Sequence, residues 1–150
     1  MSDRAQYLKE HTRSWLEAAI LCLETQADEK TKKTLLESCG RACARLSSAA
    51  KDAKAIKDSG KKIDELLDKL SRITSGKFSW QRDGEIVRVV YKKCFCPLRS
   101  GGLVKSPTFC NCSTGWLKEI FETASGKPVK VTLEQAIGQG GPICAFSIRS

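Results

Sequence analysis

Cysteine is the residue type in this chain best suited to chemistry, with eight cysteines against a single histidine. Seven of them lie in pairs or in a predicted final strand, and these are Cys39, Cys43, Cys94, Cys96, Cys110, Cys112 and Cys144. The first two are four residues apart, so a helix would carry both sulfurs on one face. Two Cys-x-Cys pairs then flank a glycine-rich loop, so folding can bring four thiols to one point.

Thiolates gathered in this way are the ligands that zinc prefers, with four in a tetrahedron at about 2.3 Å. An iron–sulfur cluster also takes cysteine ligands and is the alternative cofactor. The same thiols can instead form a redox pair or act as small buried apolar groups. Cys22 stands alone on a helix face, which favours the packing role for it. We therefore predict a thiolate metal site, with zinc as the first candidate.

A nucleophilic cysteine is the competing interpretation, and it needs a pKa lowered by a nearby cation or a helix N-terminus. Cys112 precedes a predicted helix that contains Lys118, and Cys43 lies between Arg41 and Arg45. The candidate general bases are Glu119, Glu122 and Glu134. These residues define the enzymatic alternative, a cysteine- or metal-dependent hydrolase or a thiol-redox enzyme; no catalytic residue is assigned.

The chain has 150 residues, 41% hydrophobic and 29% charged, which predicts one folded domain. No apolar run approaches a membrane span, and residues 1–10 lack the apolar core of a secretory signal, so we expect a cytoplasmic protein. The net charge is +9, and residues 75–150 carry 11 basic and 5 acidic residues. This balance admits an anionic ligand. Nucleic acid is an unlikely partner, because the lysines of residues 51–62 alternate with aspartates and lack aromatic neighbours.

Hydrophobic periodicity divides the chain near residue 76. Helical spacing predicts helices over 4–24, 29–45, 47–57, 63–73 and 115–124, the last capped by Ser113 or Thr114. Alternating residues predict a hairpin over 78–91 with a type I′ turn at Asp83-Gly84, and strands over 129–133 and 143–149. The predicted fold is α+β, a single domain over 1–150, in which the helical part (1–76) packs on a small antiparallel sheet in the cysteine-rich part (77–150).

Aromatic and aliphatic residues of this second part could line an apolar pocket. The predicted ligand-binding residues are Trp80, Tyr91, Trp116, Phe121 and Phe146, with Phe78, Val89 and Ile120 beside them. An ordinary core would use the same residue types. The predicted function is a small-molecule binding or sensing module, taking a small apolar or anionic ligand and possible as a homodimer.

The C-terminal half resembles the end of the 4-vinyl reductase domain, a hydrocarbon-binding module. The motifs are Gly115-Trp116-Leu117-Lys118, Gly126-Lys127-Pro128-Val129, Val131, Glu134 and Gly140-x-x-x-Cys144-x-Phe146, within residues 78–150. The resemblance implies an α+β fold shared with haem-NO-binding and Golgi-transport domains, and some members bind zinc at this end. Ala136 replaces the family's upstream cysteine, so only Cys144 matches that zinc site, with Glu134 as a second candidate ligand.

A second resemblance covers more of the chain. Its motifs are Cys39-Gly-Arg-Ala-Cys43-Ala-Arg45, Cys94-x-Cys96-Pro97-Leu98, Gly102-Leu103-Val104 and Phe109-Cys110-x-Cys112-Ser113-x-Gly115-Trp116. Together they are similar to a prokaryotic cysteine-rich family without an assigned function. Related sequences are likened to the L-2-amino-thiazoline-4-carboxylate hydrolase group, which implies the enzymatic alternative above.

Overall fold

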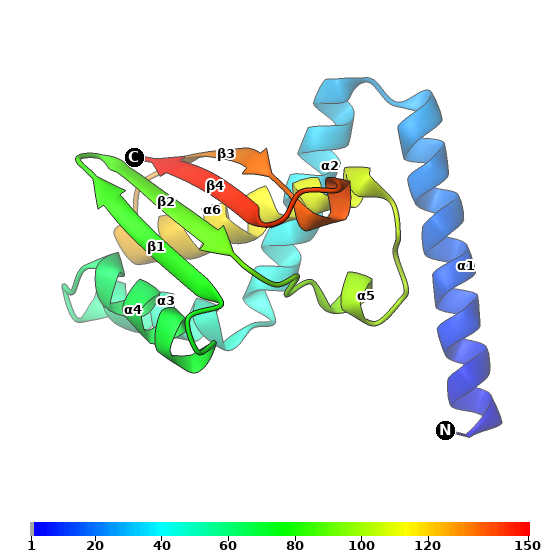
Figure 1. Cartoon of the computed structure of the whole chain (residues 1–150), viewed down its shortest axis with the longest axis horizontal. Coiled ribbons are helices and arrows are strands. Elements are labelled where there is room, and N and C mark those ends of the chain that lie inside the picture. The colour runs from blue at the N-terminus through cyan, green and yellow to red at the C-terminus, as the bar shows by residue number, and fades with distance from the viewer. Residues whose placement is uncertain (1) are drawn as a thin grey trace.

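The computed structural model describes residues 2–150, in which four helices precede the first strand and all four strands lie in the C-terminal half (Figure 1). The α-helices are α1 (Asp3–Gln26), α2 (Glu29–Arg45), α3 (Ser48–Asp58), α4 (Ile63–Ile73), α5 (Pro97–Ser100) and α6 (Cys112–Ser125). The strands are β1 (Phe78–Asp83), β2 (Ile86–Tyr91), β3 (Lys130–Gln135) and β4 (Cys144–Arg149). Two short 3-10 helices are η1 (Pro107–Asn111) and η2 (Ile137–Gln139). The predicted α+β class is confirmed.

The four strands form one antiparallel sheet in the order β1-β2-β4-β3. Central strand β2 pairs Val87 with Ile148 and Val89 with Phe146 of β4, and all four side chains are buried. Because side chains alternate along a strand, these residues share the face of the sheet that meets the helices. The same register sets Tyr91 opposite Cys144, which brings this thiol to the end of the sheet.

Helix α6 packs on the apolar face of the sheet through Leu117 and Phe121. Its other side meets α2, α3 and α4, where small residues such as Ala44 and Ala53 are fully buried. In Figure 1, α6 lies behind the strands and α3 and α4 lie beside β1. Helix α6 is therefore the central helix against which both parts of the chain pack.

The hairpin turn differs by one residue from the prediction. Asp83 pairs with Ile86, so the turn residues are Gly84 and Glu85. Gly84 has φ 58°, while Glu85 keeps a negative φ. A positive φ at the first turn residue alone characterises a type II′ turn, so the predicted type I′ turn is wrong.

Helix α6 also begins three residues before its predicted start. Helix η1 leads directly into it at Cys112, and the Thr114 hydroxyl donates to the Asn111 carbonyl (2.7 Å). Ser113 and Thr114 lie inside the helix, and neither is its cap. The predicted loop over 93–112 therefore contains α5 and η1.

Helix α1 contacts the rest of the molecule through its C-terminal half. Ile20 is buried in a cluster with Leu36, Val104 and Phe109, and Leu16 and Leu23 pack against this cluster. The Ser106 hydroxyl hydrogen-bonds the Glu24 carboxylate. Among residues 2–150, no helix is long and apolar enough to cross a membrane.

Candidate cysteine site

Helices α2 and α6 approach each other through two glycines. A β-carbon on Gly40 would overlap the backbone carbonyl of Cys112, and one on Gly115 would overlap the backbone of Glu37. Glycine at both positions is what allows the helix backbones to touch. This contact sets Cys43 of α2 beside the first turn of α6, where Cys112 lies.

Six cysteines approach one another at this end of the sheet, in two adjoining groups. They are Cys43, Cys94, Cys96, Cys110, Cys112 and Cys144, and we call them the cysteine cluster. One group joins α2, the start of α5 and the start of α6; the other joins the end of β2, η1 and β4. All eight cysteines of the chain are free thiols; Cys22, Cys39 and Cys43 are exposed, and the other five are partly buried.

Cys96 and Cys112 are neighbours in the first group, and each shifts the pKa of the other. The Cys112 thiol, the backbone N–H groups of Arg99 and Leu98, and the Arg99 charge together lower the pKa of Cys96 to about 6, although partial burial opposes them. The pair raises the pKa of Cys112 far above that of an ordinary thiol, because its proton is shared with Cys96 and the residue is largely buried. At neutral pH the pair therefore holds one thiolate beside one thiol.

Cys96 and Cys112 also share an apolar environment. Both side chains pack against the apolar cluster that contains Ile20 and Val104. Cys43 lies near Cys96 at the exposed side of the pair, and partial burial followed by the nearby Cys96 raises the pKa of the Cys43 thiol. The first group thus has an apolar side formed by this cluster and an exposed side at Cys43.

Cys110 and Cys144 of the second group lie against η2. A β-carbon on Gly138 would overlap the Cys110 sulfur and would lie 2.7 Å from the Arg99 guanidinium carbon. The backbone N–H of Ile137 donates to the Cys144 sulfur (3.3 Å). Burial raises the pKa of both the Cys110 and the Cys144 thiol, so these two are protonated at neutral pH.

Arg99 links the segments that carry the thiols. Its guanidinium donates to the carbonyls of Lys105 (3.2 Å), Ser106 (3.4 Å) and Gly138 (3.2 Å). It therefore ties α5 both to the segment before η1 and to η2. The sequence pattern gave no sign of this role, since the three acceptors are backbone groups and one lies 39 residues away.

Most of the predicted metal ligands come close together in the described residues without forming a metal site. The structure brings together six of the seven predicted ligands, while Cys39 lies exposed on α2. Within residues 2–150, however, no three or more cysteine, histidine or carboxylate groups are arranged around a point that could hold an ion. The donor types suit zinc and the observed arrangement does not. The metal site stays a prediction.

The predicted nucleophiles are not the activated ones. The pKa values of both Cys112 and Cys43 are raised, and the lowered one belongs to Cys96. Arg41 and Arg45 do not activate Cys43, because they bond the carboxylate of Glu119 at 3.1 and 2.8 Å. The prediction that these cations lower the pKa of Cys43 is wrong.

The candidate general bases are also engaged elsewhere. Glu119 accepts from Arg45 and Arg41, which lower its pKa, and Glu122 pairs with Arg41 at 2.8 Å. Glu134 pairs with Arg88 at 3.2 Å and accepts a hydrogen bond from Ser147. The hydrolase interpretation gains no base from this structure.

The predicted ligand-binding aromatics lie in or against the core between sheet and helices. Phe121 and Phe146 are buried, and Trp80, Tyr91 and Trp116 pack against the same cluster. The Tyr91 ring meets those of Phe78, Phe95 and Phe146 at centroid distances of 5.4 to 5.7 Å. Burial, followed by the nearby Cys144, raises the pKa of the Tyr91 phenol. The structure thus gathers these side chains, and their ligand-binding role stays a prediction.

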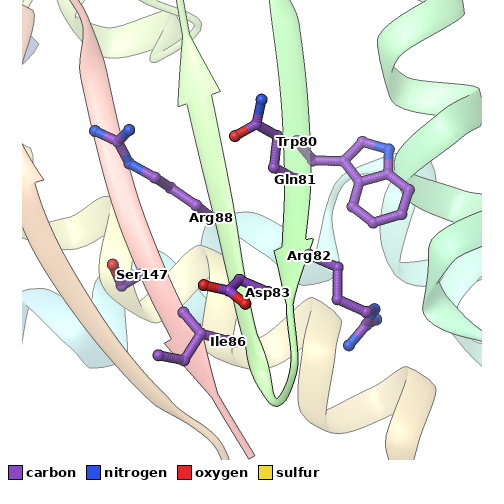
Figure 2. Close-up of a pocket in the computed structure, with 7 residues that line it drawn as sticks. All are labelled: Trp80, Gln81, Arg82, Asp83, Ile86, Arg88 and Ser147. Atoms are coloured by element: carbon purple, nitrogen blue, oxygen red, sulfur yellow. The ribbon is translucent and has the colours of Figure 1, made fainter.

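An open hollow of about 590 Å³ lies at the β1–β2 hairpin. Figure 2 shows its lining residues, which are Trp80, Gln81, Arg82, Asp83, Ile86, Arg88 and Ser147. The Trp80 indole donates to Asp68 of α4 (3.0 Å), and Arg82 pairs with Asp64 of the same helix. Of the predicted ligand-binding residues, Trp80 is the one that this hollow includes.

Solved structures of other proteins share the fold, among them the two that follow. The phenol-responsive sensory domain of the transcription activator PoxR, with phenol, is 17% identical; the match covers 93% of this chain and 74% of that one, with a TM-score of 0.57. A trafficking protein particle complex subunit 3 from Naegleria fowleri, covalently bound to palmitic acid, is 10% identical. The match covers 94% of this chain and 93% of that one, with a TM-score of 0.54. At these identities the likeness shows the fold alone.

No curated protein sequence matches the chain. One family model matches nearly all of it, over residues 2–150, and that family has no assigned function, as the second resemblance implies. The 4-vinyl reductase resemblance stays a prediction. The chain belongs to the family of unknown function DUF6144.

Proposed function

We propose that this chain is a small-molecule sensing module whose cysteine cluster takes a thiolate-seeking ligand, with zinc as the first candidate. One observation carries the proposal: six thiols from four separate parts of the chain gather at one end of the sheet, and one of them is a thiolate near neutral pH. The likeness in fold to a phenol-responsive sensory domain supports the sensing role.

The uneven pKa values within the cluster favour a ligand that binds thiolates. Cys96 supplies the first anionic donor without the loss of a proton. The three further thiols that complete a four-ligand zinc shell must lose theirs as the ion binds, so affinity rises with pH. Arg99, beside Cys96 and Cys110, offsets part of the negative charge that accumulates.

Binding must also move the chain, because the sulfurs do not surround a common point in the described residues. Four of the six thiols lie between residues 94 and 112, in a region with little regular structure besides α5 and η1. An ion that draws them to about 2.3 Å would reshape this region. A ligand that binds one arrangement better than another shifts the population toward it, which is what a sensor requires.

Metal content is the first test. Protein purified without oxygen should contain close to one equivalent of zinc per chain, and cobalt added to the metal-free protein should give a thiolate-to-cobalt absorption band. The variants C96S and C112S should lose the band, and C22S, which changes an exposed cysteine outside the cluster, should keep it. A brown protein that contains iron would show that the ligand is an iron–sulfur cluster and not zinc. Reduced protein that binds neither ion would refute the metal ligand.

Thiol–disulfide exchange is a second candidate function, favoured by the pairing of a thiolate with a thiol at Cys96 and Cys112. The Cys96 thiolate would attack a small disulfide and release one thiolate of that disulfide. Cys112 would then lose its proton to the released thiolate and attack the Cys96 sulfur, which releases the second thiolate and leaves a Cys96–Cys112 disulfide. Stopped-flow reduction of a chromogenic disulfide tests it. Activity should vanish in C96S, stop at the mixed disulfide in C112S and persist in C39S.

A further inference from the structure

Helix α1 carries two apolar stripes, and the structure uses one of them. Leu16, Ile20 and Leu23 face the body of the molecule. A second stripe, which we call the outer stripe of α1, runs along the helix about a third of a turn away. It consists of Leu8, His11, Trp15, Ala18 and Cys22, all exposed.

The outer stripe is unusual for a surface in water. Trp15 is 66% exposed and Leu8 61%, and the flanking Tyr7 and Leu21 are 68% and 60% exposed. The stripe holds no Asp, Glu, Lys or Arg over its whole length. Aromatic and leucine side chains without charges among them are typical of the buried centre of a protein interface.

We infer that α1 pairs through this stripe with α1 of a second copy, antiparallel and with Trp15 at the twofold axis. Leu8 and Cys22 each lie seven residues from Trp15, so a twofold rotation sets Leu8 of one copy opposite Cys22 of the other. A stripe that matches itself in this way is what an isologous dimer contact needs. Trp15 also lies close to the middle of α1, so the helices overlap along most of their length.

The available area suits a dimer. With about 150–250 Å² for each large side chain, the exposed parts of Leu8, Trp15, Tyr7 and Leu21 amount to roughly 400–600 Å². The exposed His11, Ala18 and Cys22 add to this area. Stable interfaces bury about 600–1,000 Å² per partner. In Figure 1, α1 stands at the edge of the molecule, with its N-terminal half extending beyond α5, so a second copy can lie along it.

Light scattering on the full chain across a series of concentrations tests the dimer. The wild type should have twice the chain mass. W15E should be monomeric with an unchanged helical circular dichroism signal, because Trp15 is exposed in the single chain. R13E is the matched control, since Arg13 is exposed on the opposite side of α1, and it should stay dimeric.

A disulfide trap tests the antiparallel geometry independently. In L8C the introduced thiol should cross-link to Cys22 of the second copy under mild oxidation, giving a covalent dimer on a non-reducing gel. Within one helix these positions are about 21 Å apart, too far for a bond in the same chain. The double variant L8C/C22S should not cross-link, and peptide mapping should identify the pair.

Several outcomes would overturn the inference. They are a wild type that is monomeric at every concentration, a W15E variant that stays dimeric, and an L8C variant whose cross-link does not involve Cys22. A monomer that co-sediments with phosphatidylcholine vesicles through Trp15 would assign the stripe to a lipid surface instead.

Discussion

Gly40 of α2 lies against the backbone carbonyl of Cys112 in α6, so close that the smallest side chain would overlap it. Gly115 makes the reciprocal contact, one turn along, with Glu37 of α2. The packing of the two helices, and with it the approach of Cys43 to Cys112, depends on the absence of two side chains.

Substitution G40A should therefore destabilise the protein by about 1–3 kcal/mol, the usual cost of a group forced into a packed interface. The sign of the change in stability is diagnostic, because replacing glycine by alanine inside a helix otherwise stabilises the helix by up to about 1 kcal/mol. Urea unfolding measures the free energy, and A42S on the exposed face of α2 is the control. A G40A protein more stable than the wild type would contradict the close contact.

The Cys96 thiolate should react with iodoacetamide in a pH-dependent manner, with a midpoint near pH 6. C112A should move this midpoint upward, because it removes the thiol that hydrogen-bonds Cys96. Mass spectrometry of the labelled peptides follows each cysteine separately. A Cys96 midpoint equal to that of exposed Cys22 would count against the paired thiolate.

Stability should respond to the same group. The pKa of Cys96 is lower in the folded protein than in the unfolded chain, so the unfolded chain binds more protons between pH 6 and 9. This contribution to stability is complete above the unfolded pKa and is lost as the pH falls through the folded one. The difference in free energy of unfolding between the wild type and C96S should thus grow from pH 6 to pH 8, as urea titrations can measure.

Arg41 joins α2 to α6 by pairing with Glu119 at 3.1 Å and Glu122 at 2.8 Å. The variant R41M should lose about 1–2 kcal/mol, because it leaves two partly buried carboxylates without this partner. A double-mutant cycle of R41M with E122Q should give a coupling energy that shows the Arg41–Glu122 pair to be stabilising. R13M, at an exposed position of α1, serves as the control and should change stability by less than about 0.5 kcal/mol.

Arg99 should hold the cysteine-bearing segments in place. R99M removes its three bonds to backbone carbonyls, so amide hydrogen exchange should accelerate around residues 103–111 and 136–139, while α3 and β2 stay protected. The pKa of Cys96 should rise as well, since Arg99 charge favours the thiolate. Uniform exchange behaviour in the variant and the wild type would refute the role.

The elements of this fold were predictable because their signals are local. The predicted helix over 29–45 matches α2, and the hairpin strands match β1 and β2. The errors fall where local rules compete. Gly84 could occupy either position of the hairpin turn, and Ser113 and Thr114 resemble caps although η1 already supplies the start of α6.

The candidate site was predictable only in part. The Cys-x-Cys spacing indicated that distant thiols meet, and six of them do. It could not indicate which thiol is activated, because the state of Cys96 depends on Cys112, Arg99 and a turn of backbone that the tertiary fold brings together. The arginines next to Cys43 in the sequence wrongly predicted a lowered pKa for its thiol, since both side chains bond Glu119 of α6.

The apolar cluster around Ile20 joins two regions that lie roughly 75–90 residues apart in the sequence. Cys96 and Cys112 pack on the same cluster as the C-terminal half of α1. Protein interiors are too dense to absorb a change on one side alone. Oxidation or ligand binding that enlarges or displaces either sulfur therefore changes the packing of α1. The Ser106–Glu24 hydrogen bond is a second contact through which the same region affects this helix.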